Sequence, residues 1–130
     1  LYLLESKHRK VHLHSTGLLG INKYSLEHLM PKKWSNNWGS LSTQDEIINR
    51  NRKLLTLGNL TIITQSLNSS IRDSNWKTKK EGKGDKNGLN EYASGIETMN
   101  KYLANDVWDE TKIAERAQDL YDIAEKAWAI

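Results

Sequence analysis

Two short, largely apolar segments of this 130-residue chain, residues 24–29 and 57–64, are predicted to form β-strands. The second segment is rich in β-branched residues, which fit the pleated surface of a sheet. Pro31 ends the first segment, because proline has no N–H to donate to a neighbouring strand. Residues 11–14 alternate between apolar and polar side chains and are expected to form an edge strand.

Helical spacing predicts helices in the rest of the chain, at residues 1–10, 44–55 and 66–80, the last with a break near Ser74. Two apolar stripes follow, one of Leu89, Tyr92, Ala93, Ile96, Met99 and Leu103, the other of Ile113, Ala117, Leu120, Tyr121, Ala124 and Trp128. We expect both stripes to face the core, with Asp109 as the N-cap of the last helix. The predicted fold class is α+β, with a strand pair embedded in a mainly helical domain.

The size and composition of the chain are those of one domain with a modest core. Cysteine is absent, which excludes disulfides and thiolate zinc sites. No apolar run has the length of a membrane span and no signal peptide is recognisable, so we expect no membrane association and a cytoplasmic location. The chain begins at Leu1, inside what reads as a helix already under way, and is therefore expected to be the C-terminal part of a longer protein.

The charge is divided unevenly along the chain. Residues 1–90 contain fifteen Lys and Arg against seven Asp and Glu, whereas residues 105–130 contain three against seven. A basic segment favours a polyanionic partner, because binding releases counterions from phosphates. The alternative is a surface whose charges only keep it solvated, and charge alone does not decide between the two.

A carboxylate and an imidazole stand side by side at Glu27 and His28, close to the expected end of a strand. Phosphodiester hydrolysis with one metal ion needs hard oxygen ligands and a base that takes a proton from water. Neighbouring strand residues point to opposite faces, so these two can serve one centre only where the strand ends or twists. Asn68 can offer an amide oxygen as a second ligand, and Asn59 can tie the intervening loop to the backbone.

These residues carry a resemblance to a known nuclease pattern. Glu-His-Leu-Met-Pro from Glu27, Gly-Asn-Leu from Gly58 and the later Asn68 resemble the His-Asn-Asn form of the HNH, or ββα-metal, motif. Tyr-Ser-Leu-Glu-His-Leu-Met-Pro, Leu-Gly-Asn-Leu-Thr-Ile-Ile-Thr, Leu-Asn-Ser-Ser-Ile and Trp-Lys-Thr-Lys further resemble the C-terminal nuclease domain of GmrSD-type modification-dependent restriction proteins. The resemblance implies a single HNH-like domain over residues 1–130, with the core motif at 24–80 and helical support at 88–130.

The resemblance also implies a role for each matched residue. His28 would be the general base, and Glu27 and Asn68 would hold a Mg²⁺ or Mn²⁺ ion. Asn59 would hold the loop and orient His28, while Lys79 would face the scissile phosphate. DNA-backbone contacts are expected from Lys32, Lys33, Arg72, Lys77 and Lys80. The sequence departs from the broader pattern in having Glu where Asp is more common, and it lacks the cysteine quartet of the zinc-braced subclass.

The expected function is therefore divalent-metal-dependent cleavage or nicking of DNA, as the effector domain of a bacterial anti-phage restriction system with an N-terminal regulatory or sensor domain. The alternative is a non-catalytic nucleic-acid-binding module with the same fold, and RNA is not excluded as a substrate. His12 and His14 could bind a metal ion together, but the interpretation that we favour is that both are solvent-exposed strand residues. Trp34 and Trp38 can stack on bases or pack inward, whereas Trp76 is expected in the core.

Overall fold

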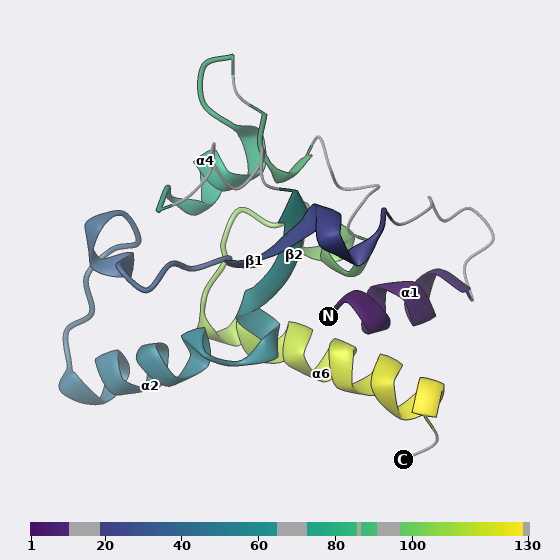
Figure 1. Ribbon diagram of the computed structural model, residues 1–130. Helices are drawn as coiled ribbons and strands as arrows, with labels where there is room; N and C mark the ends of the chain where they lie inside the picture. The colour runs from purple at the N-terminus through teal and green to yellow at the C-terminus, as the bar shows by residue number, and fades with distance from the viewer. Residues whose placement is uncertain (11–18, 65–72, 86, 91–96, 129–130) are drawn as a thin grey trace.

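The computed structural model describes residues 1–10, 19–64, 73–85, 87–90 and 97–128. Its helices are α1 (Tyr2–Lys10), α2 (Gln44–Leu54), α4 (Trp76–Glu81), α5 (Asn100–Leu103) and α6 (Glu110–Trp128), and its strands are β1 (Tyr24–His28) and β2 (Leu60–Thr64). Short 3₁₀ turns occur at η1 (Ile21–Lys23), η2 (Trp34–Asn36), η3 (Leu57–Asn59) and η5 (Glu97–Met99). The described residues thus form a mixed helical and β structure, in agreement with the predicted α+β class (Figure 1).

The two strands form an antiparallel pair in which Tyr24 lies opposite Thr64 and His28 lies opposite Leu60. We call this strand pair the β-hairpin, although α2 lies between its two strands in the sequence. Because side chains alternate along a strand, each face of the β-hairpin carries every second residue of both strands. One face, here called the core face, carries Ser25, Glu27, Thr61 and Ile63. The other, here called the open face, carries Tyr24, Leu26, His28, Leu60, Ile62 and Thr64.

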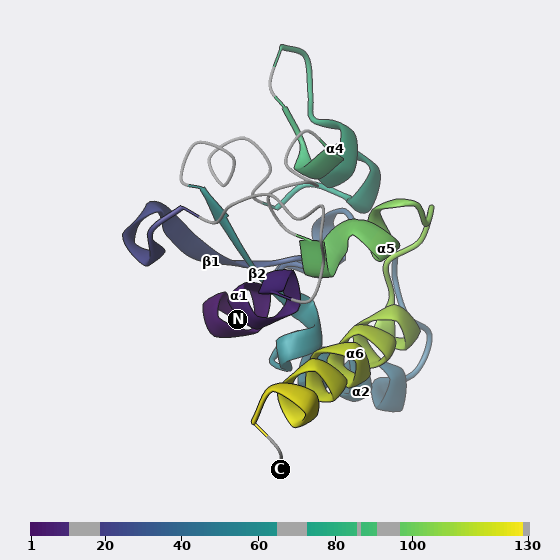
Figure 2. The ribbon, with the colours of Figure 1, turned by 90° about the vertical axis from the view of Figure 1, so that its right-hand side faces the viewer.

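The β-hairpin lies between two helical regions. Helix α4 lies on one side of it, and α2 and α6 lie together on the opposite side, as both ribbon views show (Figures 1 and 2). Helix α6 packs against η3, α1 and α2, so the long C-terminal helix supports the segment that leads into β2. In the part of the chain that the structure describes, no helix has the length and apolar character needed to cross a membrane.

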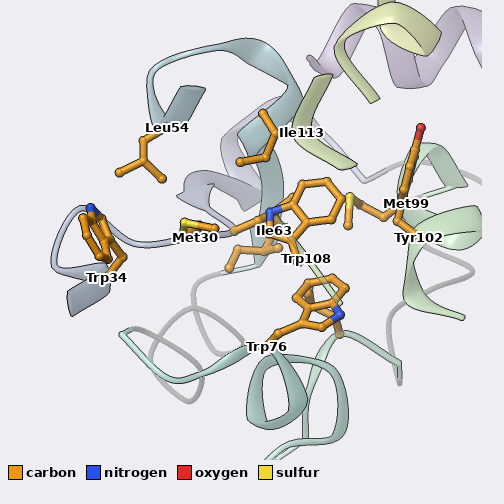
Figure 3. Packing of buried hydrophobic residues seen from close by; sticks show 11 residues of the cluster. Met30, Trp34, Leu54, Ile63, Trp76, Met99, Tyr102, Trp108 and Ile113 are labelled. Atoms are coloured by element: carbon orange, nitrogen blue, oxygen red, sulfur yellow. The ribbon is translucent and has the colours of Figure 1, made fainter. Parts of the chain in front are cut away.

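The core is built around aromatic side chains, with Trp108 at its centre (Figure 3). Its ring stacks on Trp76 with centroids 5.3 Å apart, and the Tyr102 ring meets it edge-on at 5.6 Å. Met30 and Ile63 pack on the β-hairpin side of the same cluster, and Ile113 approaches it from α6. Trp76 is therefore a core residue, as its position in the sequence predicted.

Polar residues fix where the helices begin. The Thr43 hydroxyl accepts a hydrogen bond from the Glu46 N–H at the start of α2, and Asn75 accepts one from Thr78 at the start of α4. The Asp109 carboxylate accepts the Lys112 N–H at 3.0 Å and is the N-cap of α6, which confirms the prediction. Such caps stabilise a helix by about 1 kcal/mol because they satisfy N–H groups that have no partner within it.

Several expected features differ from the structure. The second strand begins at Leu60 rather than residue 57, because residues 57–59 form the turn η3. Tyr121 and Trp128 were expected in the core but are 53% and 46% exposed, because the buried part of α6 ends at Leu120. The expected strand at residues 11–14 lies outside the described residues, as do Tyr92, Ala93 and Ile96. The first half of the helix expected at residues 66–80 also lies outside them, so the final helix of a ββα-metal unit stays a prediction.

Candidate active site

The Glu27–His28 pair lies at the end of β1, with its two side chains on opposite faces of the β-hairpin. Glu27 is paired with Thr61 on the core face, and His28 is paired with Leu60 on the open face. Both side chains are partly exposed. Strand β1 ends at His28, so both residues lie within it. The two side chains can therefore serve one centre only if the chain bends immediately after His28.

Lys79 joins the core face to the end of the strand. From α4 its ammonium donates a hydrogen bond to the His28 carbonyl at 2.8 Å and lies 3.4 Å from Glu27 Oε1. The Lys79 side chain is fully buried, and that of Glu27 is 11% exposed. Lys79 was expected to face the scissile phosphate, but here it is enclosed and holds two groups of β1 in place.

Asn59 is fully buried and holds the segment that follows His28. Its Oδ1 accepts the Met30 N–H at 2.8 Å and the Trp108 indole N–H at 3.1 Å. Its Nδ2 donates to the carbonyls of Met30, at 2.9 Å, and Leu54, at 3.2 Å. Its main-chain carbonyl also accepts the Leu29 N–H at 2.8 Å, which extends the strand pairing beyond His28. Asn59 thus lies where the sequence predicted that it would tie the loop to the backbone.

Burial and neighbouring charges shift the pKa values of this group. Burial raises the pKa of Glu27, and the attraction of Lys79 only partly opposes that shift. The pKa of His28 is lowered, first by burial and then by the positive charges of Lys32 and Lys79. Burial lowers the pKa of Lys79 although Glu27 favours its charged form. The surroundings therefore favour the neutral forms, which for His28 is the form that can accept a proton.

Two residues, Glu27 and Asn68, were predicted to hold the metal ion. Glu27 is described, whereas Asn68 lies outside the described residues, and no group of three or more His, Cys, Asp or Glu within the described ranges has metal-binding geometry. Directly across from Glu27, the Thr61 hydroxyl is buried without a hydrogen-bond partner among the described groups. The Glu27 carboxylate and the Thr61 hydroxyl, on one face, are oxygen donors of the hard type that Mg²⁺ or Mn²⁺ prefers. These donor types fit the expected ion.

The predicted DNA-contacting lysines divide into two groups. Lys32, Lys33 and Lys77 are exposed, and Arg72 lies outside the described residues. Lys80, by contrast, is 8% exposed; its ammonium donates to the Asn105 carbonyl at 2.8 Å and lies 5.6 Å from the centre of the Trp76 ring. A carbonyl and an aromatic face thus already receive the charge of Lys80 in this structure, and its contact with DNA stays a prediction.

The loop tryptophans, whose role the sequence left open, are anchored within the protein. Trp34 is buried, its indole N–H donates to Asn51 Oδ1 at 2.9 Å, and the Arg50 guanidinium lies 4.7 Å from its ring centre. Trp38 is partly buried and donates to the Ser74 carbonyl at 3.1 Å. These contacts favour packing over base stacking. His12 and His14 lie outside the described residues.

Sequence reasoning missed three residues that surround this site: Thr61, Trp108 and Arg116. Trp108 orients Asn59, and the Arg116 guanidinium donates to the carbonyls of Gly58 and Leu60 on either side of it. A signal for Arg116 was present, because it falls three residues after Ile113 and four before Leu120, on the apolar side of the helix. A charged residue in that position indicates a buried polar partner.

A comparison with protein families gives a match over residues 1–123 to the family described as GmrSD restriction endonucleases, C-terminal domain. The chain therefore belongs to this family, in agreement with the resemblance found in its motifs. No curated protein and no solved structure matches the chain. Family membership indicates a nuclease domain of the restriction endonuclease type.

Proposed function

We propose that this member of the GmrSD C-terminal domain family is a divalent-metal-dependent DNA endonuclease of the HNH, or ββα-metal, type. A restriction endonuclease domain implies DNA as the substrate. The observation that carries the finer proposal is the surroundings of His28. Its imidazole is partly exposed, its own carbonyl is held by Lys79, and the next two residues are held by Asn59.

In this proposal His28 is the general base. Burial and the charges of Lys32 and Lys79 lower its pKa, so the imidazole is neutral at neutral pH and has a lone pair available. It would take a proton from the water that attacks phosphorus in line with the leaving oxygen. The strand holds the backbone of His28, which limits the positions that its imidazole can take relative to that water.

Glu27 and Asn68 would hold the Mg²⁺ or Mn²⁺ ion. When bound, such an ion supplies positive charge that stabilises the developing negative charge on the leaving oxygen. Lys79 keeps the Glu27 carboxylate on the core face, and the buried Thr61 hydroxyl opposite it has no partner among the described groups, so it would be a further oxygen donor facing the ion. Lys79 and a metal ion would compete for the same carboxylate, so ion binding is expected to weaken the Lys79–Glu27 contact.

Contacts to the DNA backbone would come from the exposed side chains of Lys32, Lys33 and Lys77, together with Arg72. Phosphate contacts fix the position of a protein on DNA but carry no sequence information. Cleavage or nicking by this domain should therefore depend weakly on sequence. Recognition of modified DNA would belong to an N-terminal regulatory or sensor domain, with the present chain as the effector of an anti-phage restriction system.

Conversion of supercoiled plasmid to nicked or linear forms tests this function, measured with Mg²⁺, with Mn²⁺ and with EDTA. His28→Ala should lower the cleavage rate by about 100-fold or more, because general-base catalysis contributes on that scale. His8→Ala is the matched control, since it makes the same chemical change in α1. It should retain the wild-type rate.

Equal cleavage by the wild type and His28→Ala, in preparations free of other nucleases, would show that the assigned base is wrong. DNA binding without cleavage by either protein would instead favour a non-catalytic nucleic-acid-binding module. Cleavage that persists in EDTA would remove the metal from the proposal.

A further inference from the structure

The turn η3, which leads into β2, is held by a buried guanidinium from α6. Arg116 is 1% exposed, and its Nη1 donates to three main-chain carbonyls. The distances are 2.6 Å to Leu60, 3.0 Å to Gly58 and 3.3 Å to Leu57. A single charged donor thus fixes the peptide groups on both sides of Asn59.

The helix also approaches this turn without a side chain between them. A Cβ on Gly58 would lie 2.1 Å from the Ile113 carbonyl oxygen, so no other residue fits there without moving α6 or η3. This close approach brings the η3 carbonyls within reach of Arg116, one turn further along α6. Carbonyl oxygens of a turn that has no strand partner need a donor when they are buried, and the guanidinium supplies it.

The other side of the guanidinium belongs to a polar network that reaches α1. Arg116 Nη2 lies 3.4 Å from the Thr98 hydroxyl, and Thr98 donates both its N–H and its hydroxyl to the Glu5 carboxylate. Glu5 in turn pairs with Arg9 at 3.4 Å. Burial lowers the pKa of Arg116 to about 10, so the guanidinium stays charged at neutral pH. Its bonds to the carbonyls are therefore charge-assisted, which strengthens them.

These contacts form a continuous path from α6 to the proposed base. Arg116 holds the carbonyls that flank Asn59, Asn59 holds the main chain of Leu29 and Met30, and Leu29 directly follows His28. Removal of the guanidinium would leave the Gly58 and Leu60 carbonyls without this donor and allow η3 to move. Asn59 would move with η3, and the end of β1 with Asn59.

We propose that Arg116 is a positioning residue of this nuclease, whose guanidinium fixes η3 so that Asn59 can hold the backbone next to His28. The inference rests on the proposed function for its catalytic consequence, although the hold of Arg116 on Asn59 can be measured separately. Arg116 touches neither His28 nor Glu27 in any described contact, so it acts through Asn59.

The test compares Arg116→Lys with Arg50→Lys in the full 130-residue chain. Lysine keeps the charge but cannot reach three carbonyls and Thr98 together. Arg50 is the matched control, because it is a buried arginine that joins α2 to α6 through Glu110, and its described hydrogen bonds and ring contact go to Glu110, Trp38 and Trp34 rather than to η3 or β1. Arg116→Lys should lower kcat for plasmid cleavage by about 10- to 100-fold with little change in KM, since small misplacements of reacting groups have effects of that size. Arg50→Lys should leave kcat within about twofold of the wild type, because it disturbs only packing remote from the site.

A second readout needs no activity. The Trp108 indole N–H donates to Asn59 Oδ1, so its ¹H–¹⁵N NMR signal reports the position of Asn59. The signal should shift in Arg116→Lys and stay in place in Arg50→Lys. If the wild type does not cut DNA, that pattern still supports the hold of Arg116 on Asn59, while the nuclease proposal fails.

An unshifted Trp108 signal in folded Arg116→Lys, or a shifted signal with unchanged kcat, would overturn the inference. If Arg116→Lys does not fold, Arg116→Gln replaces it, because the glutamine amide is shorter and cannot reach all three carbonyls. A folded Arg116→Gln protein with an unshifted Trp108 signal would overturn the inference in the same way.

Discussion

The two faces of the β-hairpin place neighbouring residues in very different surroundings. The core face carries Ile63 and Thr61, which are almost fully buried, and Glu27 paired with the enclosed Lys79. The open face carries His28 and Leu26, which is 56% exposed. Leu26 also lines a shallow apolar depression of about 430 Å³, together with residues of α1, η3 and β2.

This difference shows how one dipeptide can supply two kinds of chemistry. The alternation of a strand sends Glu27 towards a cation and His28 towards solvent, although they are adjacent in the chain. The carboxylate is held by a salt bridge, and the imidazole is left able to exchange protons with water. Asn59 lies where the strand pair ends, directly before β2, and there it fixes the segment after His28.

The largest effect should follow from removing this common support. Asn59→Ala leaves the Met30 N–H and carbonyl, the Leu54 carbonyl and the Trp108 indole without their partner. The loss of free energy of unfolding should be about 3 kcal/mol or more, because each buried unsatisfied group costs about 1–3 kcal/mol. Urea denaturation measures it.

Asn51→Ala provides the control for that experiment. Asn51 is exposed and accepts a single hydrogen bond from Trp34, so its loss should cost about 1 kcal/mol. If Asn59→Ala costs no more than this control, Asn59 does not support the end of β1 as described.

The next effect concerns the core face alone. Lys79→Met should lower the free energy of unfolding by about 3 kcal/mol, because it leaves the Glu27 carboxylate and the His28 carbonyl without their donor. Glu27→Gln in the same protein should recover about 1 kcal/mol or more, since it removes the unpaired charge. The four proteins of this double-mutant cycle are compared by urea denaturation. Strictly additive losses would mean that the Lys79–Glu27 pair contributes nothing.

A smaller effect, of the opposite sign, is expected across the strand from Glu27. Thr61→Val should raise the free energy of unfolding by about 1 kcal/mol, because it replaces a buried hydroxyl that lacks a partner with a methyl group. The same change should weaken Mn²⁺ binding if the hydroxyl serves the proposed ion site. Thr61→Ser, which keeps the hydroxyl, should retain Mn²⁺ binding and should not raise the free energy of unfolding. A destabilised Thr61→Val would mean that the hydroxyl has a partner.

The smallest effect concerns the open face. Lys32 is exposed, and its charge is one of the causes that lower the pKa of His28. Lys32→Gln removes a charge that disfavours the protonated imidazole, so the pKa of His28 should rise towards its ordinary value. The acidic limb of the pH–rate profile should therefore move to higher pH, as should an NMR titration of His28. Lys33→Gln is the control and should shift the pH–rate profile and the His28 titration less. Equal shifts in both variants would mean that Lys32 has no specific effect on the pKa of His28.

The sequence predicted the local elements well where one signal dominated. A short strand candidate ended by Pro31 indicated β1 almost to the residue, and Asp109 was identified as the cap of α6. The turn η3 was missed, because Leu57 and Gly58 continue the apolar run of β2 and only their contact with α6 reveals the bend. Periodicity likewise overextended the buried stripe of α6, since it cannot show how far the neighbouring elements reach.

For the site, the motif located Glu27, His28 and Asn59, but it could not describe what surrounds them. Lys79 and Lys80 look alike in the sequence, yet one holds β1 and the other a carbonyl beside Trp76. That distinction depends on the direction in which α4 crosses the β-hairpin, which no local pattern carries. Thr61, Trp108 and Arg116 come from distant segments and meet the site only through tertiary packing.

We propose above that Glu27 and Asn68 hold one divalent cation, with His28 next to it as the base. Titration of the ¹⁵N-labelled chain with Mn²⁺ tests it directly, because this paramagnetic ion broadens the NMR signals of residues close to it. We expect the signals of residues 27, 28, 61 and 68 to weaken first and EDTA to restore them. Glu27→Gln should abolish the broadening. Broadening that begins in the acidic segment 105–130, or that is unchanged in Glu27→Gln, would contradict it.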